Sequence, residues 1–390
     1  MFAGGLLLLY NNICKRANCF LNIKPALRFT NSVKIIEAMF LNSGEKRYLG
    51  VDVGASGIKI VELKKEGTKV RLVSYGVGEL KDAQINSNWQ NETEKIARMI
   101  KAVHEKASMG SKDAIAALPT YSVFSSVLNL SNVDKKDIDS AVKWEAKKVI
   151  PMPLEEMVID WVEIKDELPD GQPPAAKGKN LKILLTGAPK NLIEKYIAVF
   201  KEVQFNLISL ETETLSLIRS LVGNDKSSLA IVEIGTNTTD IFIVEKGIPV
   251  LSRSIDVGGL TITKSVAQSL NVSLARAEQF KFDLGISSLE SDESAIPKTI
   301  IESITPIIDE IKYTLNLYQG KSGGRLDKVV LSGGSALLIN FTNYLTKILN
   351  CKVLIGDPWA RVYCPVDLMP KLKELGPRLA VAVGLAMREM

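Results

Sequence analysis

Two segments of this chain share a pattern, and that repeat constrains the fold more than any other feature. Residues 48–63 read as strand, glycine turn and strand, and residues 229–244 repeat the same order. In each segment an acidic residue near the end of the first strand is followed two positions later by glycine, which places Asp52 opposite Glu233. Internal similarity of this kind indicates a duplicated structural unit. We therefore predict two related halves, each opening with one of these hairpins.

The residue types in both hairpins suit a site for phosphate groups. Glycine lets a turn approach a ligand closely, so that consecutive backbone N–H groups can point at phosphate oxygens. A carboxylate at a strand end can hold a hydrated Mg²⁺, which keeps several of its waters. Two such hairpins facing each other would hold a polyphosphate from both sides. A single hairpin alone would equally fit an ordinary tight turn, and the second one in register favours the site.

Two further segments carry residues of interest. Residues 329–338 predict a strand, a Gly333-Gly334 turn and a helix, whose N-terminus would favour an anionic ligand group. Glu278 and Lys281 are three positions apart in a helical stretch and therefore lie on one face. A solvated ion pair is the alternative interpretation of these two residues.

The composition excludes several classes of protein. With 46% hydrophobic residues the chain is too apolar to be disordered, and no run approaches the roughly 20 apolar residues of a membrane-spanning helix. One histidine and four cysteines leave little material for a zinc site or a His-based triad. An enzyme built from this chain would therefore depend on carboxylates, backbone amides and a hard metal ion. The sparse cysteines suit a reducing cytoplasm.

The first 38 residues differ from the rest in charge. They contain five Lys or Arg and one Glu, and so hold most of the net charge of +5. The remainder is nearly neutral, which argues against a nucleic-acid partner. The apolar run precedes the positive charges, the reverse of a secretory signal. An organellar presequence and a start codon assigned upstream of Met39 both remain open, and residues 1–38 are left out of the predicted fold.

Residues 141–156 form the most specific motif, a predicted helix that runs into an Ile-Pro-x-Pro-Leu-Glu-Glu turn. With the two hairpins and the other two segments in this chain order, the sequence resembles the PilM family of type IV pilus assembly proteins. That family lies within the actin, heat-shock-70 and sugar-kinase ATPase superfamily. Residues 253–259 and Asp357-Pro358 support the resemblance, which covers roughly residues 45–388.

The resemblance implies an α/β protein with an actin-like (ribonuclease-H-like) two-lobe ATPase fold and a small α/β (SHS2-like) insertion in the first lobe. The expected boundaries are residues 45–118 and 188–223 for the first lobe, 119–187 for the insertion, 228–269 and 327–390 for the core of the second lobe, and 270–326 for a subdomain of the second lobe.

The resemblance also implies an ATP site with Mg²⁺. The expected nucleotide-binding residues are Asp52, Gly54, Ala55, Ser56, Gly57, Lys59, Glu233, Gly235, Thr236, Asn237, Thr238, Gly258, Gly259, Glu278, Lys281, Gly333, Gly334 and Ser335. Asp52 and Glu233 would hold the metal through water, and Glu211 or Glu213 would orient an attacking water molecule.

Glu233 departs from the family pattern, in which the second hairpin usually begins with Asp. The extra methylene moves the carboxylate by roughly 1.5 Å, one carbon–carbon bond. Misplacements of about 1 Å can cost on the order of 100-fold in rate. We therefore expect ATP binding with weak or no ATPase activity.

The implied function is that of a cytoplasmic scaffold, peripheral to the inner membrane. It would dock the N-terminal cytoplasmic tail of a PilN-like single-pass protein between the first lobe and the insertion, and couple it to the pilus motor ATPases. The membrane would be reached only through partners, and a homo-oligomer is consistent with the family. Trp144, Ile150 and Pro151 could form an apolar docking surface, or could instead pack within the insertion.

Two other functions remain open on the sequence alone. One is an FtsA-like cell-division homologue of actin that polymerises on the membrane. The other is a small-molecule kinase of the same superfamily, which needs a carboxylate base aimed at a substrate hydroxyl. Asp113 and Asp160 are the candidates for that base.

Overall fold

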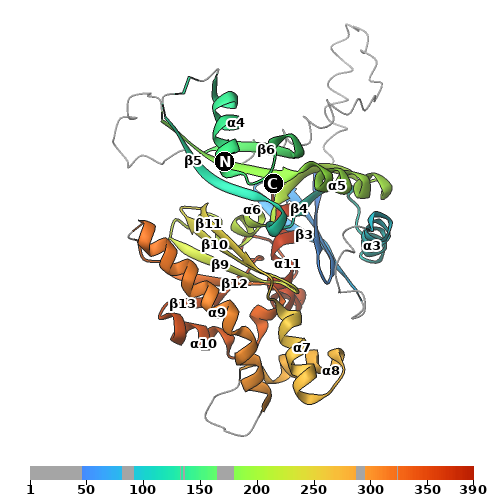
Figure 1. The fold of residues 1–390 in the computed structure, drawn as a ribbon. Coiled ribbons are helices and arrows are strands. Elements are labelled where there is room, and N and C mark those ends of the chain that lie inside the picture. Colours follow the sequence, from blue (N-terminus) through green and yellow to red (C-terminus); the bar gives the residue numbers. More distant parts are fainter. Residues whose placement is uncertain are drawn as a thin grey trace.

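A computed structural model describes residues 46–80, 92–131, 133–134, 137–164, 180–286, 295–322 and 324–390. Within these residues the chain forms two five-stranded sheets and one three-stranded sheet, surrounded by helices (Figure 1).

The first sheet has the strand order β3-β2-β1-β4-β8. Its strands are β1 (Arg47–Gly54), β2 (Gly57–Glu66), β3 (Lys69–Glu79), β4 (Asp113–Leu118) and β8 (Asn206–Thr212). β1 pairs antiparallel with β2 and parallel with β4, and β4 pairs parallel with β8. The carboxyl ends of β1, β4 and β8 therefore meet at one edge.

The second sheet repeats this arrangement with the order β11-β10-β9-β12-β13. Its strands are β9 (Leu229–Ile234), β10 (Thr239–Glu245), β11 (Ile248–Ile255), β12 (Lys328–Ser332) and β13 (Lys352–Ile355). β9 pairs antiparallel with β10 and parallel with β12, as β1 does with β2 and β4. The duplication predicted from the hairpins is thus confirmed strand by strand, and these sheets with their helices are called the first and second lobes.

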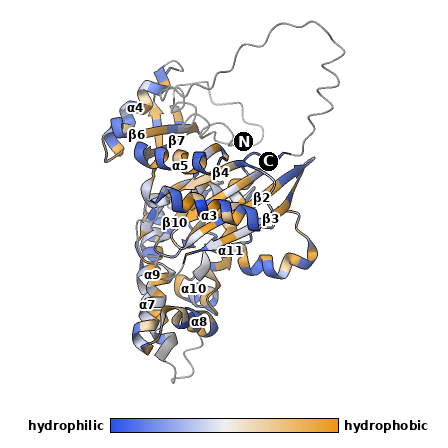
Figure 2. Cartoon of the chain, turned by 90° about the vertical axis from the view of Figure 1, so that its right-hand side faces the viewer, coloured by the Kyte–Doolittle hydropathy of each residue, from blue (hydrophilic) through white to orange (hydrophobic). Residues whose placement is uncertain are grey.

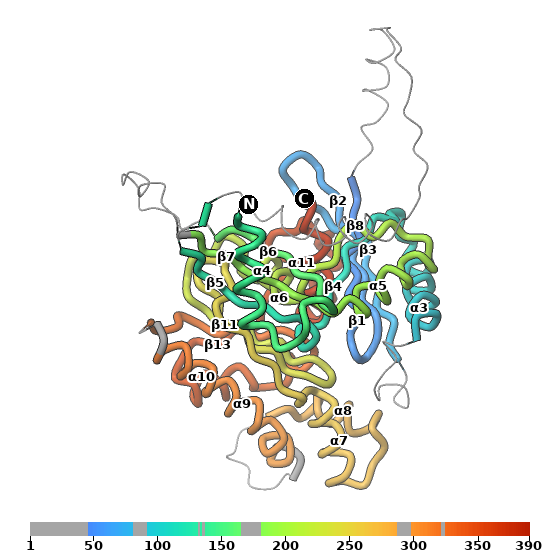
Figure 3. The backbone as a smooth tube through the Cα atoms, turned by 45° about the horizontal axis from the view of Figure 1, so that its top comes forward, coloured from blue at the N-terminus to red at the C-terminus, as the bar shows by residue number. Residues whose placement is uncertain are grey.

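The insertion lies between β4 and the last strand of the first sheet. It comprises β5 (Phe124–Ser131), α4 (Ile138–Val149), β6 (Met157–Glu163) and β7 (Asn180–Pro189), with the sheet order β5-β7-β6. Figures 1 and 3 both show it at the end of the molecule opposite α7 (Gly259–Leu270) and α8 (Leu274–Leu284).

Helices cover each large sheet and enclose a separate apolar core. In the first lobe α3 (Thr93–Lys106) and α5 (Lys190–Glu202) pack against the sheet through side chains such as Ile100 and Phe200. In the second lobe α7, α8, α9 (Ala295–Ser322) and α10 (Phe341–Leu349) surround Ile243 and Ile304. Figure 2 shows the resulting contrast between hydrophobic strands and helices with hydrophilic outer faces.

Two helices cross between the lobes. α11 (Met369–Ala386) packs against β1 and β2 of the first lobe and meets α6 (Glu213–Leu217), which continues into a π-helical turn, Ile218–Val222. The approach is close at Gly384, where an added Cβ would lie 1.9 Å from the Ser216 carbonyl oxygen. A glycine is therefore required where the two helices touch.

In the described ranges, no helix combines the length and the apolar composition that crossing a bilayer requires.

Candidate functional site

The first hairpin presents an ion pair at the carboxyl edge of its sheet. Asp52 and Lys59 are register partners on β1 and β2, and their Oδ2 and Nζ atoms lie 2.7 Å apart. Burial lowers the pKa of Lys59, but the neighbouring Asp52 carboxylate more than offsets this, so that the pKa stands above its ordinary value. Lys59 therefore stays protonated and fixes Asp52 in place.

The second hairpin places two carboxylates at the equivalent positions. Glu233 on β9 pairs in register with Asp240 on β10, so both side chains lie on the same face. Loss of hydration raises the pKa of Asp240 to about 6. The pKa of Glu233 is raised well above its ordinary value by desolvation first, then by the charges of Glu213 and Asp240. This side of the site therefore combines two acidic side chains that retain their protons to higher pH than free carboxyl groups do.

Glu213 joins these groups from the first lobe, at the start of α6. Its Oε2 atom accepts hydrogen bonds of 2.8 Å from both the backbone N–H and the hydroxyl of Thr120, which lies two residues after the end of β4. Desolvation raises the pKa of Glu213 to about 8, and the charges of Asp240 and Asp52 add to this rise. Asp240 of the second lobe thus acts on Glu213 of the first lobe across the boundary between the lobes.

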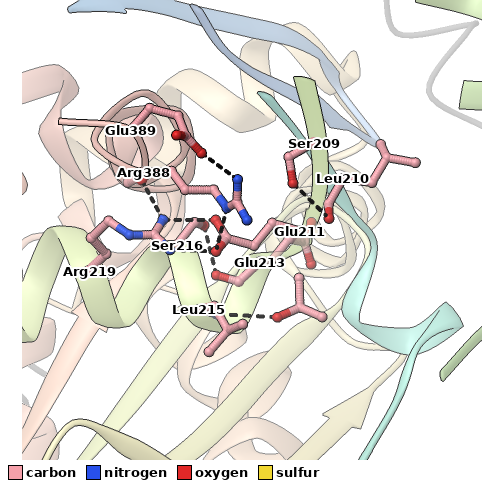
Figure 4. Close-up of polar contacts among 11 residues, drawn as sticks. Ser209, Leu210, Glu211, Glu213, Leu215, Ser216, Arg219, Arg388 and Glu389 are labelled. Atoms are coloured by element: carbon pink, nitrogen blue, oxygen red, sulfur yellow. Dashed lines mark hydrogen bonds and ion pairs between the residues drawn. The ribbon is translucent and has the colours of Figure 1, made fainter. Parts of the chain in front are cut away.

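Glu211 lies only two residues away but belongs to a different cluster (Figure 4). Its carboxylate is 2% exposed and binds both guanidinium nitrogens of Arg219, one of them at 2.8 Å. The Nε atom of Arg388 lies 3.7 Å from the same carboxylate. Of the two residues expected to orient water, the structure brings Glu213 to the other site carboxylates and engages Glu211 in this buried ion-pair cluster.

The remaining second-lobe residues gather around the turn of the second hairpin. The Gly259 N–H donates to the Gly235 carbonyl at 2.8 Å, which docks the start of α7 on the hairpin turn. Lys281 is 2% exposed and donates to the Gly259 carbonyl, to Thr263 Oγ1 and to Glu278 Oε2 at 3.2, 3.0 and 2.7 Å. Burial lowers the pKa of Lys281. The Glu278–Lys281 pair thus connects α8 to the start of α7, and its lysine is shielded from solvent.

The third glycine turn follows β12. Gly333 has φ +83°, and an added Cβ would lie 2.2 Å from the Ile234 carbonyl oxygen, so only glycine fits there. The next residues, Gly334 and Ser335, begin a short 3₁₀ turn. Ser335 is buried, and its hydroxyl would be 2.5 Å from a Cβ added at Gly259. The three glycine-containing segments of the second lobe are therefore in mutual contact.

The residues expected to bind nucleotide fall into two groups, one in each lobe. The first lobe contributes Asp52, Gly54, Ala55, Ser56, Gly57 and Lys59, and the second contributes Glu233, Gly235, Thr236, Asn237, Thr238, Gly258, Gly259, Glu278, Lys281, Gly333, Gly334 and Ser335. The sequence reasoning overlooked Asp240, although the register of two matched hairpins places it opposite Glu233.

The two aspartates considered for a kinase base lie elsewhere. Asp113 is at the first residue of β4, and because β4 runs parallel to β1 it lies at the edge of the sheet opposite Asp52. Asp160 is buried in β6 of the insertion, where one oxygen accepts the Trp161 N–H at 2.9 Å. The one histidine, His104, contacts the Ser111 carbonyl at 2.8 Å and Phe205, away from the site.

The donor set suits a hydrated divalent cation. In the part of the chain that the structure describes, no three His, Cys, Asp or Glu side chains form a direct ligand set. The charges of Asp52 and Asp240 nevertheless raise the pKa of Glu213, and the charges of Glu213, Asp240 and Asp52 raise the pKa of Glu233, so acidic side chains of both lobes lie near one another. Mg²⁺ usually keeps several waters and is bound by one or two carboxylates plus substrate phosphates, so these residues fit Mg²⁺ held through water.

The duplicated strand order, the crossing helices and the site at the carboxyl edges of both sheets define an actin-like two-lobe α/β protein. A solved structure entitled PilM-PilN type IV pilus biogenesis complex has the same fold, with a TM-score of 0.75 and 21% identity, over 88% of this chain and 99% of that one. The family model described as type IV pilus assembly protein PilM matches residues 50–390. The chain therefore belongs to the PilM family.

Other relatives of this chain carry the name cell division protein FtsA. The protein from Neisseria meningitidis serogroup B is 21% identical over 383 residues, which is 87% of this chain and 90% of that protein. The protein from Buchnera aphidicola subsp. Baizongia pistaciae is 28% identical over 199 residues, 43% of this chain. That match spans 46% of the Buchnera protein, less than half of its length.

Proposed function

We propose that this chain is an ATP-binding scaffold of type IV pilus assembly, located in the cytoplasm against the inner membrane. The observation that supports ATP binding is the proximity of the two hairpins, since Glu233 of the second lobe interacts with Lys59 and Asp52 of the first. One hairpin holds the Asp52–Lys59 ion pair, and the other holds the Glu233–Asp240 carboxylate pair. The lysine and the glycine turns would contact phosphate oxygens. A bound Mg²⁺ would neutralise the polyphosphate and the surrounding carboxylates.

In this proposal hydrolysis is slow. Glu213 is the residue placed to orient a water molecule, because its carboxylate is fixed by Thr120 and faces the other site carboxylates. Its raised pKa of about 8 keeps much of it protonated near neutral pH, which weakens it as a base. Glu233, one methylene longer than Asp, adds to the same effect.

The partner in this proposal is the cytoplasmic tail of a PilN-like single-pass membrane protein, and the solved relative was determined as a PilM–PilN complex. The tail would dock between the first lobe and the insertion, where Tyr121 is 55% exposed. Of the three apolar residues considered for docking, Trp144 is 65% exposed, whereas Ile150 is 6% exposed within the core of the insertion. Pro151 is exposed beside it. Coupling to the pilus motor ATPases completes the proposed role.

Calorimetric titration with ATP·Mg²⁺, with and without a peptide copied from the tail of the PilN-like partner, tests this proposal. Binding of both ligands is expected, and any mutual effect measures their coupling. Peptide binding without ATP binding would mean that the hairpins only support the fold. ATP binding without peptide binding, together with ATP-dependent sedimentation, would favour the FtsA-like function instead.

A further inference from the structure

Arg378 contacts both lobes beside the candidate site. The Arg378 Nη2 atom lies 2.5 Å from the Glu79 Oε1 atom. Glu79 lies on β3 and is the register partner of Gly57 in the first hairpin. On the other side, a Cβ added at Gly334 would lie 3.8 Å from the Arg378 Cγ. The side chain therefore reaches from the third glycine turn of the second lobe to the edge of the first hairpin.

The backbone at Arg378 is fixed relative to the glycine turn. The carbonyl of the preceding residue, Pro377, accepts hydrogen bonds from the Gly333 N–H at 3.0 Å and from Ser332 Oγ at 3.2 Å. Both donors belong to the segment that carries Gly334. Because α11 is held to this segment by two bonds, the start of the Arg378 side chain has a defined position at the site.

The charge of Arg378 reaches the Asp52–Lys59 pair. The pKa of Lys59 is set first by desolvation and by Asp52, and repulsion from Arg378 is one of the remaining influences. Arg378 thus adds positive charge on the side of the site where the first hairpin would meet phosphate, opposite the carboxylates of the second hairpin.

Of the site cations Lys59, Lys281 and Arg378, Arg378 has the ion-pair partner that a ligand can displace most easily. The side chains of Lys59 and Lys281 are 16% and 2% exposed, each held by a carboxylate at 2.7 Å. The Glu79 side chain is 63% exposed, and exposed ion pairs contribute little to stability. A guanidinium binds phosphate through two parallel N–H bonds, so phosphate can replace Glu79 at small cost.

We propose that Arg378 is a phosphate-binding residue of the nucleotide site, and that Glu79 holds it until a nucleoside di- or triphosphate takes its place. This inference rests on the proposed ATP binding. It adds a residue that the family resemblance did not supply, and it makes Glu79 a competitor of the ligand. Removing the arginine and removing its competitor should therefore change affinity in opposite directions.

The test is a titration of the full chain and its variants with ATP, ADP and adenosine in the presence of Mg²⁺. Arg378→Ala is expected to weaken ATP and ADP about tenfold, the effect of one charge-assisted bond, and to leave adenosine unchanged. Glu79→Gln is expected to tighten ATP and ADP by about threefold, by releasing the guanidinium. Arg378→Lys should fall between Arg378→Ala and the unchanged protein, because a lysine cannot bind bidentately.

Lys371→Ala is the matched control, because Lys371 lies on the same helix and pairs with Glu374 in an exposed 2.8 Å bridge. Its affinities should equal those of the unchanged protein. Arg378→Ala affinities equal to those of the control, or an equal loss for adenosine, would overturn the assignment of Arg378 to phosphate. Absence of nucleotide binding by the unchanged protein would instead overturn the proposed function. Unfolding temperatures of all variants show whether each one is folded.

Discussion

Glu233 faces Asp240 across the second hairpin, whereas the equivalent residue of the first hairpin, Asp52, faces Lys59. The two lobes share one strand order, yet only the first hairpin provides its own counter-charge. The second therefore gains most from an added cation, since a bound Mg²⁺ would remove the repulsion between neighbouring carboxylates. The asymmetry gives each hairpin a different part in holding Mg²⁺ and phosphate.

Asp240→Asn is expected to stabilise the unliganded protein by about 1–2 kcal/mol at pH 8, because it removes one of two facing carboxylates. The same change should weaken the Mg²⁺-dependent binding of ATP. Thermal unfolding and titration measure the two effects. Asp283→Asn, at an exposed position on α8, is the control and should change neither. A lower unfolding temperature for Asp240→Asn would contradict this view of the pair.

The stability of the unliganded protein should fall as the pH rises from about 5 to about 8. The pKa values of Asp240 and Glu213 in the fold are about 6 and about 8, above those of the unfolded chain, roughly 4. The folded state therefore retains protons that the unfolded state has lost, and stability decreases with pH across this interval. Asp160, whose pKa burial raises to about 7, acts in the same direction.

Urea denaturation at pH 5.5, 7 and 8.5 measures this dependence. ATP·Mg²⁺ should stabilise the protein more at pH 8.5 than at pH 5.5, because the cation favours the ionised carboxylates. Glu213→Gln should flatten the pH profile. A stability that does not fall with pH over this interval would show that these groups are already ionised in the unliganded fold.

Exchanging Glu211 and Glu213 for Gln should separate a structural carboxylate from a functional one. Glu211→Gln removes the buried carboxylate that pairs with Arg219 and is expected to cost about 3 kcal/mol in unfolding free energy. Glu213→Gln should leave the fold intact and reduce the slow single-turnover hydrolysis of ATP about 100-fold. Denaturant titration and rapid-quench kinetics distinguish the two. Equal destabilisation by both changes would place Glu213 in a structural role as well.

Glu233→Asp is expected to increase single-turnover ATP hydrolysis, by up to about 100-fold, because the carboxylate withdraws by one carbon–carbon bond. ATP affinity should change little, since the backbone amides of the turn remain in place. Asp52→Glu makes the reverse change in the first hairpin and should weaken the 2.7 Å contact with Lys59. Equal hydrolysis rates for Glu233→Asp and the unchanged protein would remove side-chain length as the cause of slow turnover.

Tyr121→Ala should weaken binding of the partner peptide about tenfold, as expected for an exposed aromatic side chain at an interface. The unfolding free energy should change by less than about 0.5 kcal/mol. Trp144→Ala, on α4 of the insertion, is the comparison with a similarly exposed aromatic residue. Loss of binding only with Trp144→Ala would move the docking surface from the lobe–insertion junction to the exposed side of α4.

Local patterns were sufficient to predict the repeated hairpins, because β-branched strands and glycine turns are encoded within about 16 residues. The insertion, expected as a small α/β unit, comprises the strands β5, β6 and β7 and the helix α4. Asp240 was within reach of this reasoning, since the register that pairs Asp52 with Lys59 pairs Glu233 with Asp240. The prediction compared only the acidic strand ends.

Other features depend on contacts between distant parts of the chain. The position of Arg378 follows from the packing of α11 against both lobes, which no local pattern records. The different surroundings of Glu211 and Glu213 arise because the strand ends at Thr212 and a helix begins at once. That change of backbone direction turns one carboxylate toward two arginines and the other toward Thr120.

The pairing of β4 with β8 as parallel neighbours in the first sheet has a consequence for the evolution of this architecture. The insertion and α5 leave the sheet at one strand and return at its immediate neighbour. The second lobe connects its matching strands, β12 and β13, through only a short turn and α10. The insertion can therefore be gained, lost or exchanged as a single unit. Such a change would alter partner recognition and leave intact the hairpins on which nucleotide binding would depend.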